Sequence, residues 1–476
     1  MKVFVKIILL ICFFNCKMEA QIYFNNNYEI GALVHGSTSV IEDSLGEYLI
    51  LGQEITGSYR AINFIKADIN GDTLWTKSFP RNQYAYYTGY SNSLIETKDN
   101  GYTFGGTVIN LLDTTNEGDA LLVKLDNNLD TLWTKQFGGT ALDVANISIE
   151  CSDSGFVLIG STNSYGSGQS DFYMVKTDNN GNFQWQKTFG TAAQEEAYSG
   201  IQTLDNGFVL SGYQGSQLYI VKTDSSGNFQ WQKTFSGTAG QGFIEQLSDS
   251  TYILVGSKNV SGFAYQAYMA KLTSTGTIIW SQTYGGAGDQ QFYAIPIILN
   301  DGSIVCSGIS TLGTPWGLLV KVDSFGNEKW VRTFYKSSTI YNDFFDVKQT
   351  IDDGFVMTGT TFVTTQDSWL VKVDSNGCEI ANCNVGIEEL QSDGLQLKVY
   401  PNPCNDYATV EIRLSETQAS AKLIVYNLLG SEIIEQKVIN NETYIIDTKE
   451  YNNGIYFFVL STEAGIVARE KIIVSK

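Results

Sequence analysis

The stretch DSGFVLIG, at residues 153–160, recurs along most of the chain and decides its fold. An acidic residue followed closely by glycine is typical of a tight turn, and the β-branched and aromatic residues after it are typical of a strand. The copies occupy residues 46–52, 99–106, 153–160, 205–212, 250–256, 301–308 and 353–359. The chain therefore contains seven copies of a turn that leads into an apolar strand.

Two further patterns follow within each repeat. The first is KTDNNG at residues 176–181, with counterparts that start at Lys66, Lys124, Lys222, Lys271, Lys321 and Lys372. The second is Trp-x-Lys-x-Phe with its variants, which starts only at Trp75, Trp133, Trp185, Trp231, Trp280 and Trp330. Each repeat thus predicts four strands in about 50 residues, which is the size of a propeller blade.

The repeats resemble those of β-propeller proteins, and the spacing from Asp178 through Gly181 to Trp185 resembles a loose Asp-box, a structural hairpin element of that family. A single four-stranded unit cannot bury both faces of its sheet, whereas stacked units can. We therefore predict an all-β fold with a seven-bladed β-propeller over residues 21–380. The last repeat lacks its Trp strand, and residues 21–29 belong to no complete repeat, so we expect this N-terminal strand to close the ring. Six blades with partial units at the ends, or an open solenoid, are the alternatives.

Composition and charge narrow the function classes. The chain has 476 residues, with 46 glycines, 27 tyrosines and 26 phenylalanines but only 5 prolines, and its net charge is −20. A nucleic-acid binder needs a basic surface, which this balance excludes, and an anionic membrane would repel the chain. We expect a soluble monomer.

The first 20 residues predict a cleaved export signal. Lys2 and Lys6 precede an apolar run at residues 7–14 that is too short to span a bilayer, and Ala20 offers a small residue for cleavage. A lipoprotein signal that ends at Cys16 is the alternative. No later segment is long and apolar enough for a transmembrane helix, so we expect none.

The C-terminal residues 395–476 alternate apolar and polar residues, as half-buried strands do. They contain VYPNP at 399–403, VYN at 425–427, NGIYF at 453–457 and KIIVSK at 471–476. In this order the motifs resemble the type A sorting domain of the type IX secretion system, with Cys404 as one departure. The matching residues are Pro401, Asn402, Pro403, Gly430, Asn453, Gly454, Tyr456, Lys471 and Lys476.

This resemblance implies a small Ig-like β-sandwich after a linker at residues 381–394. It also implies that the type IX secretion machinery is a partner, and that the protein crosses the outer membrane. The mature protein would then be extracellular or attached to the cell surface.

Acidic turns raise the question of metal binding. The turns at Asp178, Asp224 and Asp323 gather oxygen side chains as Ca²⁺ loops do. Asp and Asn also stabilise tight turns through their own backbone, and the presence of the pattern in nearly every repeat favours that interpretation. We therefore expect no cofactor, with Ca²⁺ at these aspartates as the alternative. His35 is the single histidine, which excludes a multi-His zinc site.

Ligand contacts and catalytic groups have few candidates. Trp316 and Trp369 break the repeat pattern and are candidate ligand platforms, with core packing as the alternative. Several carboxylates fall in loops between repeats on one rim, and loops carry function more often than strands do. They are Glu195, Glu196, Asp289 and Asp343.

We predict a secreted binding or scaffold module for a glycan or a protein, with no assigned catalytic residue. A secreted hydrolase or lyase acting on polysaccharide is the alternative, and a purely structural surface component is a third hypothesis.

The cysteines that follow the export signal fall into two groups. Cys378 and Cys383 flank a short loop and could pair in an oxidising compartment. Cys151 and Cys306 lie in expected strands and are interpreted as buried small apolar residues.

Overall fold

The chain folds into two compact units, Met1–Ala381 (the ring unit) and Asn382–Lys476 (the C-terminal unit). Every regular element in the part of the chain that the structure describes is a β-strand, and no helix there could span a membrane. The computed structural model describes residues 22–29, 34–56, 59–79, 83–113, 115–261, 263–286, 288–311, 315–336, 341–363, 365–379, 396–413, 420–427, 432–439, 442–462 and 465–476. The expected export signal (1–20) and linker (381–394) lie outside these residues.

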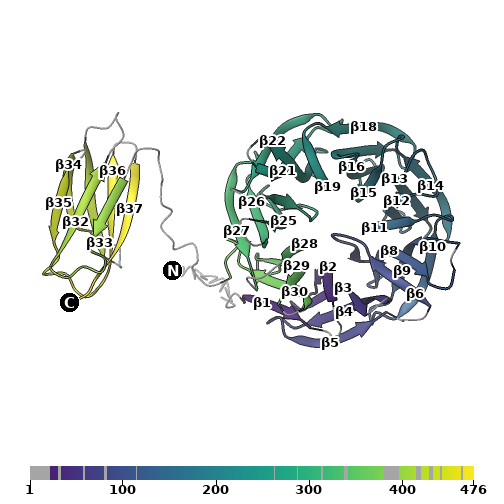
Figure 1. Ribbon diagram of the computed structural model, residues 1–476, viewed down its shortest axis with the longest axis horizontal. Coiled ribbons are helices and arrows are strands. Elements are labelled where there is room, and N and C mark those ends of the chain that lie inside the picture. Colours follow the sequence, from purple (N-terminus) through teal and green to yellow (C-terminus); the bar gives the residue numbers. More distant parts are fainter. Residues whose placement is uncertain are drawn as a thin grey trace, which may run out of the picture. The chain divides into compact units, whose positions relative to one another are not determined.

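In the ring unit, antiparallel sheets follow one another around a circle, and β2, β11, β15, β19 and β28 lie nearest its centre (Figure 1). Three of the sheets have four strands in chain order. Their strands are β11 (Asp143–Glu150), β12 (Phe156–Thr162), β13 (Asp171–Thr177) and β14 (Phe183–Phe189); β15 (Glu195–Gln202), β16 (Phe208–Gln214), β17 (Gln217–Thr223) and β18 (Phe229–Phe235); and β19 (Thr238–Gln246), β20 (Tyr252–Val260), β21 (Phe263–Leu272) and β22 (Ile278–Tyr284).

Two sheets have an interrupted innermost strand and so count five strands each. The first consists of β6 (Tyr84–Thr88), β7 (Leu94–Glu96), β8 (Tyr102–Asn110), β9 (Asp119–Leu125) and β10 (Thr131–Phe137). The second consists of β23 (Gln290–Phe292), β24 (Ile297–Ile298), β25 (Ile304–Ser310), β26 (Trp316–Val322) and β27 (Glu328–Phe334).

The remaining sheet joins the two ends of the repeat region. It has the order β28-β29-β30-β2-β3-β4-β5, with β1 paired to β30. Its strands are β1 (Phe24–Tyr28), β2 (Val34–Glu42), β3 (Tyr48–Thr56), β4 (Tyr59–Ala67), β5 (Thr73–Ser78), β28 (Asn342–Gln349), β29 (Phe355–Phe362) and β30 (Gln366–Val373).

The repeated lysine ties the two turns of a sheet together. Lys176 is buried, and its ammonium lies 2.9 Å from the Asp153 carboxylate in the first turn and donates to the Thr177 carbonyl at 2.7 Å. The same ion pairs form between Lys124 and Asp99, Lys222 and Asp205, and Lys372 and Asp352. The repetition of Lys and Asp in the sequence is therefore a requirement of the fold.

The repeated tryptophan ties neighbouring sheets together. The indole of Trp133 lies against Gly181, in the turn of the next sheet, where an added Cβ would lie 2.7 Å from the ring. The same glycine contact recurs for Trp185, Trp231, Trp280 and Trp330. Since the turn and the indole come from different sheets, each contact fixes the angle between two sheets.

The N-terminal strand supplies this contact where the seventh tryptophan is missing. As the sequence predicts, β1 completes the sheet of the last repeat, because it pairs antiparallel with β30 from Phe24↔Lys372 to Tyr28↔Ser368. The Phe24 ring lies against Gly71 and packs edge-on against Tyr48, with 5.6 Å between ring centroids. Phe24 thus takes the place of the repeated tryptophan, and β1 lies beside β30 where the ring closes (Figure 1).

The C-terminal unit contains two antiparallel sheets around one apolar core. Leu423, Val425, Phe458, Leu460 and Ile472 are buried between them. The first sheet consists of β31 (Gln396–Tyr400), β32 (Tyr407–Arg413) and β35 (Thr443–Asp447). The second has the order β34 (Glu432–Ile439), β33 (Ser420–Asn427), β36 (Gly454–Thr462) and β37 (Gly465–Val474).

The cysteines behave as the sequence suggests where they are described. Cys151 and Cys306 are free and buried, and burial raises the pKa of both thiols. Cys378 forms a disulfide, and its expected partner Cys383 lies outside the described residues. Cys404 is also free and buried in the C-terminal unit.

Candidate functional site

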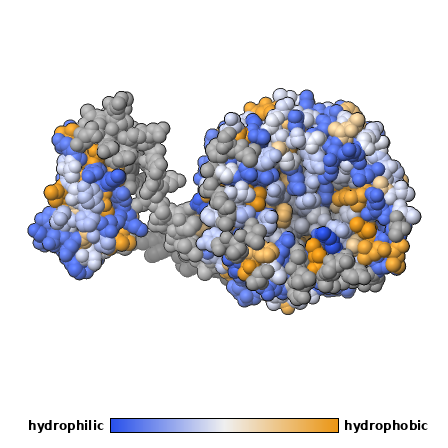
Figure 2. Space-filling model, viewed as in Figure 1, coloured by the Kyte–Doolittle hydropathy of each residue, from blue (hydrophilic) through white to orange (hydrophobic). Residues whose placement is uncertain are grey.

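The ring has two rims with different chemistry. The turn rim carries the two repeated turns of each sheet, including the ion pair between Lys176 and Asp153. The loop rim carries the connections between sheets and the first residues of the innermost strands. Polar and apolar residues are interspersed over the visible face of the ring (Figure 2), so surface hydropathy alone does not locate a site.

A pocket of about 630 Å³ opens on the loop rim, which is within the usual size of a small-ligand site. It is bounded by β2, β3, β4, β6 and β8, by the start of β11, and by β28, β29 and β30. Its lining is mostly aromatic, aliphatic, hydroxyl and amide groups, and Arg60 is its single charged residue. The lining residues are Gly36, Ser37, Thr38, Gln53, Ile55, Arg60, Tyr87, Thr88, Gly89, Tyr90, Thr107, Ile109, Leu142, Val144, Asn146, Phe345, Thr360 and Gln366.

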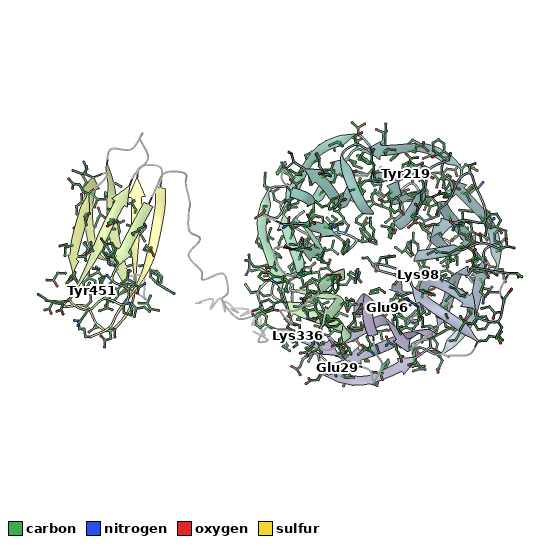
Figure 3. The ribbon with its side chains drawn as sticks, in the orientation of Figure 1. Glu29, Glu96, Lys98, Tyr219, Lys336 and Tyr451 are labelled. Atoms are coloured by element: carbon green, nitrogen blue, oxygen red, sulfur yellow. The ribbon has the colours of Figure 1, made fainter. Side chains whose placement is uncertain are left out.

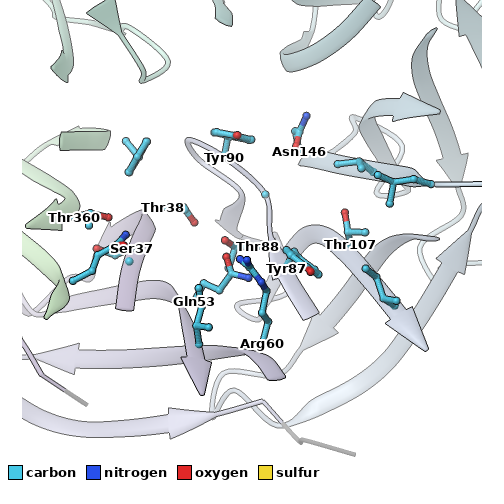
Figure 4. Close-up of a pocket in the computed structure, with 18 residues that line it drawn as sticks. Ser37, Thr38, Gln53, Arg60, Tyr87, Thr88, Tyr90, Thr107, Asn146 and Thr360 are labelled. Atoms are coloured by element: carbon cyan, nitrogen blue, oxygen red, sulfur yellow. The ribbon is translucent and has the colours of Figure 1, made fainter. Parts of the chain in front are cut away.

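Arg60 reaches this pocket from the start of β4. Residues 53, 55 and 60 share one face of the sheet, because Gln53 pairs with Ile62 and Ile55 with Arg60. The Arg60 guanidinium lies 4.9 Å from the centroid of the Tyr87 ring, and Gln53 donates to the Tyr86 carbonyl at 3.3 Å. Figure 4 shows Gln53, Arg60 and Tyr87 grouped on one wall of the pocket. No carboxylate among the described residues forms an ion pair with Arg60.

Bulges in the innermost strands place aromatic rings at the centre of the ring. The register shifts past Asn146 in β11, past Tyr198 in β15 and past Phe345 in β28. Tyr90 and Tyr198 meet edge-on at 4.9 Å between centroids, and Tyr293 stacks on Phe345 at 5.9 Å. We call Tyr90, Tyr198, Tyr293 and Phe345 the aromatic collar. Burial, with smaller effects of Asp343 and Tyr90, raises the pKa of Tyr293 to about 12.

A second pocket of about 370 Å³ adjoins the first and shares Tyr90, Leu142, Val144 and Asn146 with it. The two together are called the mouth groove. The single charged residue of the second pocket is Glu196, which accepts hydrogen bonds from Gln194 Nε2 at 2.7 Å and from the Tyr198 hydroxyl at 2.9 Å. Burial and this carboxylate raise the pKa of Tyr198, so the hydroxyl remains a donor.

The four carboxylates that the sequence places on one rim lie at or just before the starts of innermost strands. Glu195 is buried and accepts a hydrogen bond from Gln214, while Asp289 accepts one from the Tyr265 amide. Asp343 pairs in register with Thr360, a residue of the first pocket. Burial raises the pKa of Asp343 to about 7, and its Oδ1 is buried without a hydrogen-bond partner.

The carboxylate oxygens of the candidate Ca²⁺ aspartates accept hydrogen bonds from groups of their own turns. Asp178 Oδ1 accepts from the amides of Asn180 and Asn182, and its Oδ2 accepts from the Asn182 side chain at 2.9 Å. Asp224 and Asp323 make the same three bonds. Within the described ranges, no group of three or more His, Cys, Asp or Glu side chains is placed to hold a metal. We do not propose metal binding at these turns.

The two candidate tryptophans lie outside the mouth groove. Trp369 is fully buried, stacks on Phe344 at 4.3 Å between centroids and donates from Nε1 to Asn25 of β1 at 2.7 Å. An indole in the core offers no face to a ligand, so its role is packing. Trp316 is partly exposed and stacks on Tyr335 at 5.6 Å.

Sequence reasoning did not single out Arg60, Gln53 or Tyr87. A signal for Arg60 is present, because it lies six residues before the repeated Lys66 and no other repeat has a charged residue there. The corresponding residues are Gly118, Ser170, Ser216, Tyr265, Pro315 and Gln366.

The sorting residues hold the last strand of the C-terminal unit. Pro401, Asn402 and Pro403 follow β31, and the Asn402 side chain donates to the Lys471 carbonyl and accepts from the Ile473 amide, both at 2.9 Å. Asn453 Oδ1 accepts from the Lys476 amide. Gly454 begins β36, and the Tyr456 ring packs 4.8 Å from that of Tyr451, which is labelled in Figure 3. Gly430 lies outside the described residues.

Comparisons with known proteins identify one end of the chain. Residues 398–475 match the family described as the secretion system C-terminal sorting domain. This domain indicates export through the type IX secretion system to the cell surface or the extracellular space.

For the chain as a whole, a search of curated proteins finds no significant match. Among solved structures, a crystal structure of BP39L lectin from Burkholderia pseudomallei is similar to this chain at 7% identity and a TM-score of 0.48. The match covers 74% of this chain and 98% of the lectin chain.

Proposed function

We propose that the ring is a seven-bladed β-propeller. The sheet of β28–β30, β1 and β2–β5 divides naturally in two, because β30 and β2 are joined by the single residue pair Val34↔Gln366. On that division β1 is the fourth strand of the last blade. The domain order is an export signal at 1–20, the propeller at 21–380, a linker at 381–394 and an Ig-like sorting sandwich at 395–476.

The propeller acts as a carbohydrate-binding module that is displayed outside the cell. The observation that carries this proposal is the mouth groove, which combines partly exposed aromatic rings with neutral amide and hydroxyl groups. Sugars present apolar C–H faces and many hydroxyls, so they suit a site with aromatic rings and polar groups that can both donate and accept. Tyr87, Tyr90, Gln53 and Asn146 supply these groups in one place.

An enzyme acting on polysaccharide is the second candidate. It is favoured by Asp343, whose pKa of about 7 suits a general acid, and by Glu196, a second carboxylate at the start of an innermost strand. In this hypothesis both residues would have to reach one glycosidic bond.

A glycan array with the exported chain, residues 21–476, tests both candidates. Binding that Tyr87→Ala weakens about tenfold or more, without product formation, supports the binding module. Product formation that Asp343→Asn abolishes would replace the binding module by the enzyme. Binding whose affinity Tyr87→Ala leaves unchanged would place the ligand outside the mouth groove.

A further inference from the structure

The mouth groove contains one arginine, Arg60, that is not part of the repeated ion pairs of the fold. We propose that Arg60 selects sugars that bear a negative charge, a carboxylate or a sulfate, within the glycan-binding function proposed above. The carbohydrate would lie against Tyr87 and Tyr90, with its acidic group on the Arg60 guanidinium. This inference rests on the proposed function and specifies its ligand class.

Arg60 is the single charged residue among the residues that line the first pocket. Its guanidinium carries five N–H donors and lies over the Tyr87 ring. A partly shielded cation without a counter-ion costs free energy, which an anionic ligand would recover through charge-assisted hydrogen bonds. Gln53, on the same face of the sheet, adds an amide beside it.

The comparison with Lys66, on the same strand, shows that Arg60 does not belong to the repeated ion pairs of the fold. Lys66 belongs to the repeated pattern and forms ion pairs with Asp43 and Glu47 at the turn rim. Arg60 lies at the opposite end of β4, at a position that is uncharged in every other repeat. A residue that the fold does not require, placed in a pocket, is a candidate for specificity.

The surrounding carboxylates do not neutralise Arg60. Glu196 lies in the second pocket, where Gln194 and the Tyr198 hydroxyl already bind it. Asp343 does not line either pocket, and its raised pKa reduces its negative charge near pH 7. The chain has a net charge of −20, so an acidic glycan would be repelled from most of the surface, and Arg60 would offset that field within the mouth groove.

The test compares each charged probe with a neutral probe on the same sugar backbone. Oligogalacturonate with its methyl ester, and a sulfated galactan oligosaccharide with the unsulfated one, are titrated calorimetrically into the exported chain. We expect at least one acidic probe to bind at least about tenfold more tightly than its neutral counterpart, and the pair with the larger difference identifies the acidic group. The preference should weaken as salt rises from about 50 to about 300 mM.

Arg60→Gln should remove the preference for the charged probe, and Arg60→Lys should keep part of it. The matched control is Arg332→Gln, because Arg332 also lies over an aromatic ring, Trp330 at 5.4 Å, but outside the mouth groove. It should leave the preference unchanged. Unfolding midpoints of all variants separate loss of binding from loss of folding.

Equal binding of both acidic probes and their neutral counterparts, or an acid preference that survives Arg60→Gln, would overturn the inference and leave the glycan-binding proposal standing. Failure of every carbohydrate on the array and in the titrations to bind would instead overturn the proposed function itself. The two failures are therefore distinguishable.

Discussion

The two rims of the ring differ in how much they repeat. On the turn rim, one ion pair and one aromatic contact recur from sheet to sheet, as in Lys176 with Asp153 and Trp133 with Gly181. On the loop rim, corresponding positions carry unrelated residues, and Arg60 occurs in one sheet alone. Contacts that recur hold the sheets in place, whereas a residue that occurs once is free to serve binding.

The turn rim itself shows why its residues repeat. Where glycine follows the turn aspartate by two positions, the repeated lysine is almost completely buried, with 2–5% of its side chain exposed at Lys124, Lys176, Lys222 and Lys372. In each of these sheets the glycine stands directly before the second strand. Where Glu47 or Thr251 stands directly before the second strand instead, Lys66 and Lys271 are 13% and 16% exposed. A Cβ at the glycine would overlap the lysine ammonium, so glycine leaves the room in which the lysine side chain is buried.

The largest predicted effect compares two glycines on opposite rims. Gly155→Ala should lower the free energy of unfolding by about 3 kcal/mol, because its Cβ would overlap the Lys176 ammonium and the Thr177 carbonyl. Gly286→Ala, on the loop rim, has open space around the new Cβ and should change it by less than about 0.5 kcal/mol. Urea titration of both variants checks the difference. Equal effects would contradict the account of the turn rim.

The next effect concerns the closure of the ring. Phe24→Ala should cost about 2 kcal/mol, since it removes the ring that replaces the seventh tryptophan against Gly71 and Tyr48. Phe229→Ala is the control, because Phe229 is exposed on β18. Limited proteolysis should cut the Phe24 variant faster within its first residues. A variant as stable as the wild type would show that β1 does not close the ring.

A smaller effect separates a buried ion pair from an exposed one. Asp205→Asn leaves the buried Lys222 without its counter-ion and should cost about 1.5 kcal/mol, less than a fully buried pair because Asp205 reaches solvent. Asp301→Asn breaks the pair with Lys329, in which both side chains are largely exposed, and should cost less than about 0.5 kcal/mol. Thermal unfolding in parallel measures both. A reversed order would mean that burial of the lysine does not decide the cost.

Much of the fold could be predicted from the sequence because it depends on local, repeated patterns. Turn residues and apolar runs mark the strands. Residues 21–29 belong to no complete repeat and the last repeat lacks its Trp strand, which together predict that β1 joins the last sheet. The sorting domain was predictable because its motifs occur in a fixed order.

The candidate site was not predictable for a physical reason. Arg60, Tyr87 and Asn146 lie in strands of three consecutive sheets, and the packing of these sheets side by side brings the residues to one pocket. The sequence also could not decide whether Trp369 binds a ligand or packs in the core, because its burial depends on Phe344 and on Asn25 from the far end of the chain. The charge at position 60 marks Arg60 as unusual among the repeats, but it does not tell which residues of other sheets lie beside it.

The smallest predicted effect concerns how the free energy of unfolding depends on pH, which has opposite signs for one carboxylate on each rim. On the turn rim, burial would raise the pKa of Asp99, but hydrogen bonds from Thr97 and Lys124 outweigh it and lower the pKa to about 2. Its stabilising contribution is therefore complete above about pH 4 and is lost as pH falls from 4 to 2. On the loop rim, burial raises the pKa of Asp343 to about 7, so the folded state holds its proton more tightly than the unfolded state. That contribution is complete below about pH 4 and is lost as pH rises through 7.

Differences in unfolding free energy between the wild type and Asp99→Asn or Asp343→Asn, measured from pH 2 to 8, isolate these two contributions. The Asp99 difference should fall by about 1 kcal/mol between pH 4 and 2 and stay level above pH 5, since much of that side chain reaches solvent. The Asp343 difference should fall between about pH 4 and 7 by a similar amount, about 1 kcal/mol, because part of that side chain reaches solvent. Parallel curves for the two variants would mean that the loop rim shields its carboxylate no more than the turn rim does. The irregular rim would then have no distinct electrostatic environment of the kind that a binding site requires.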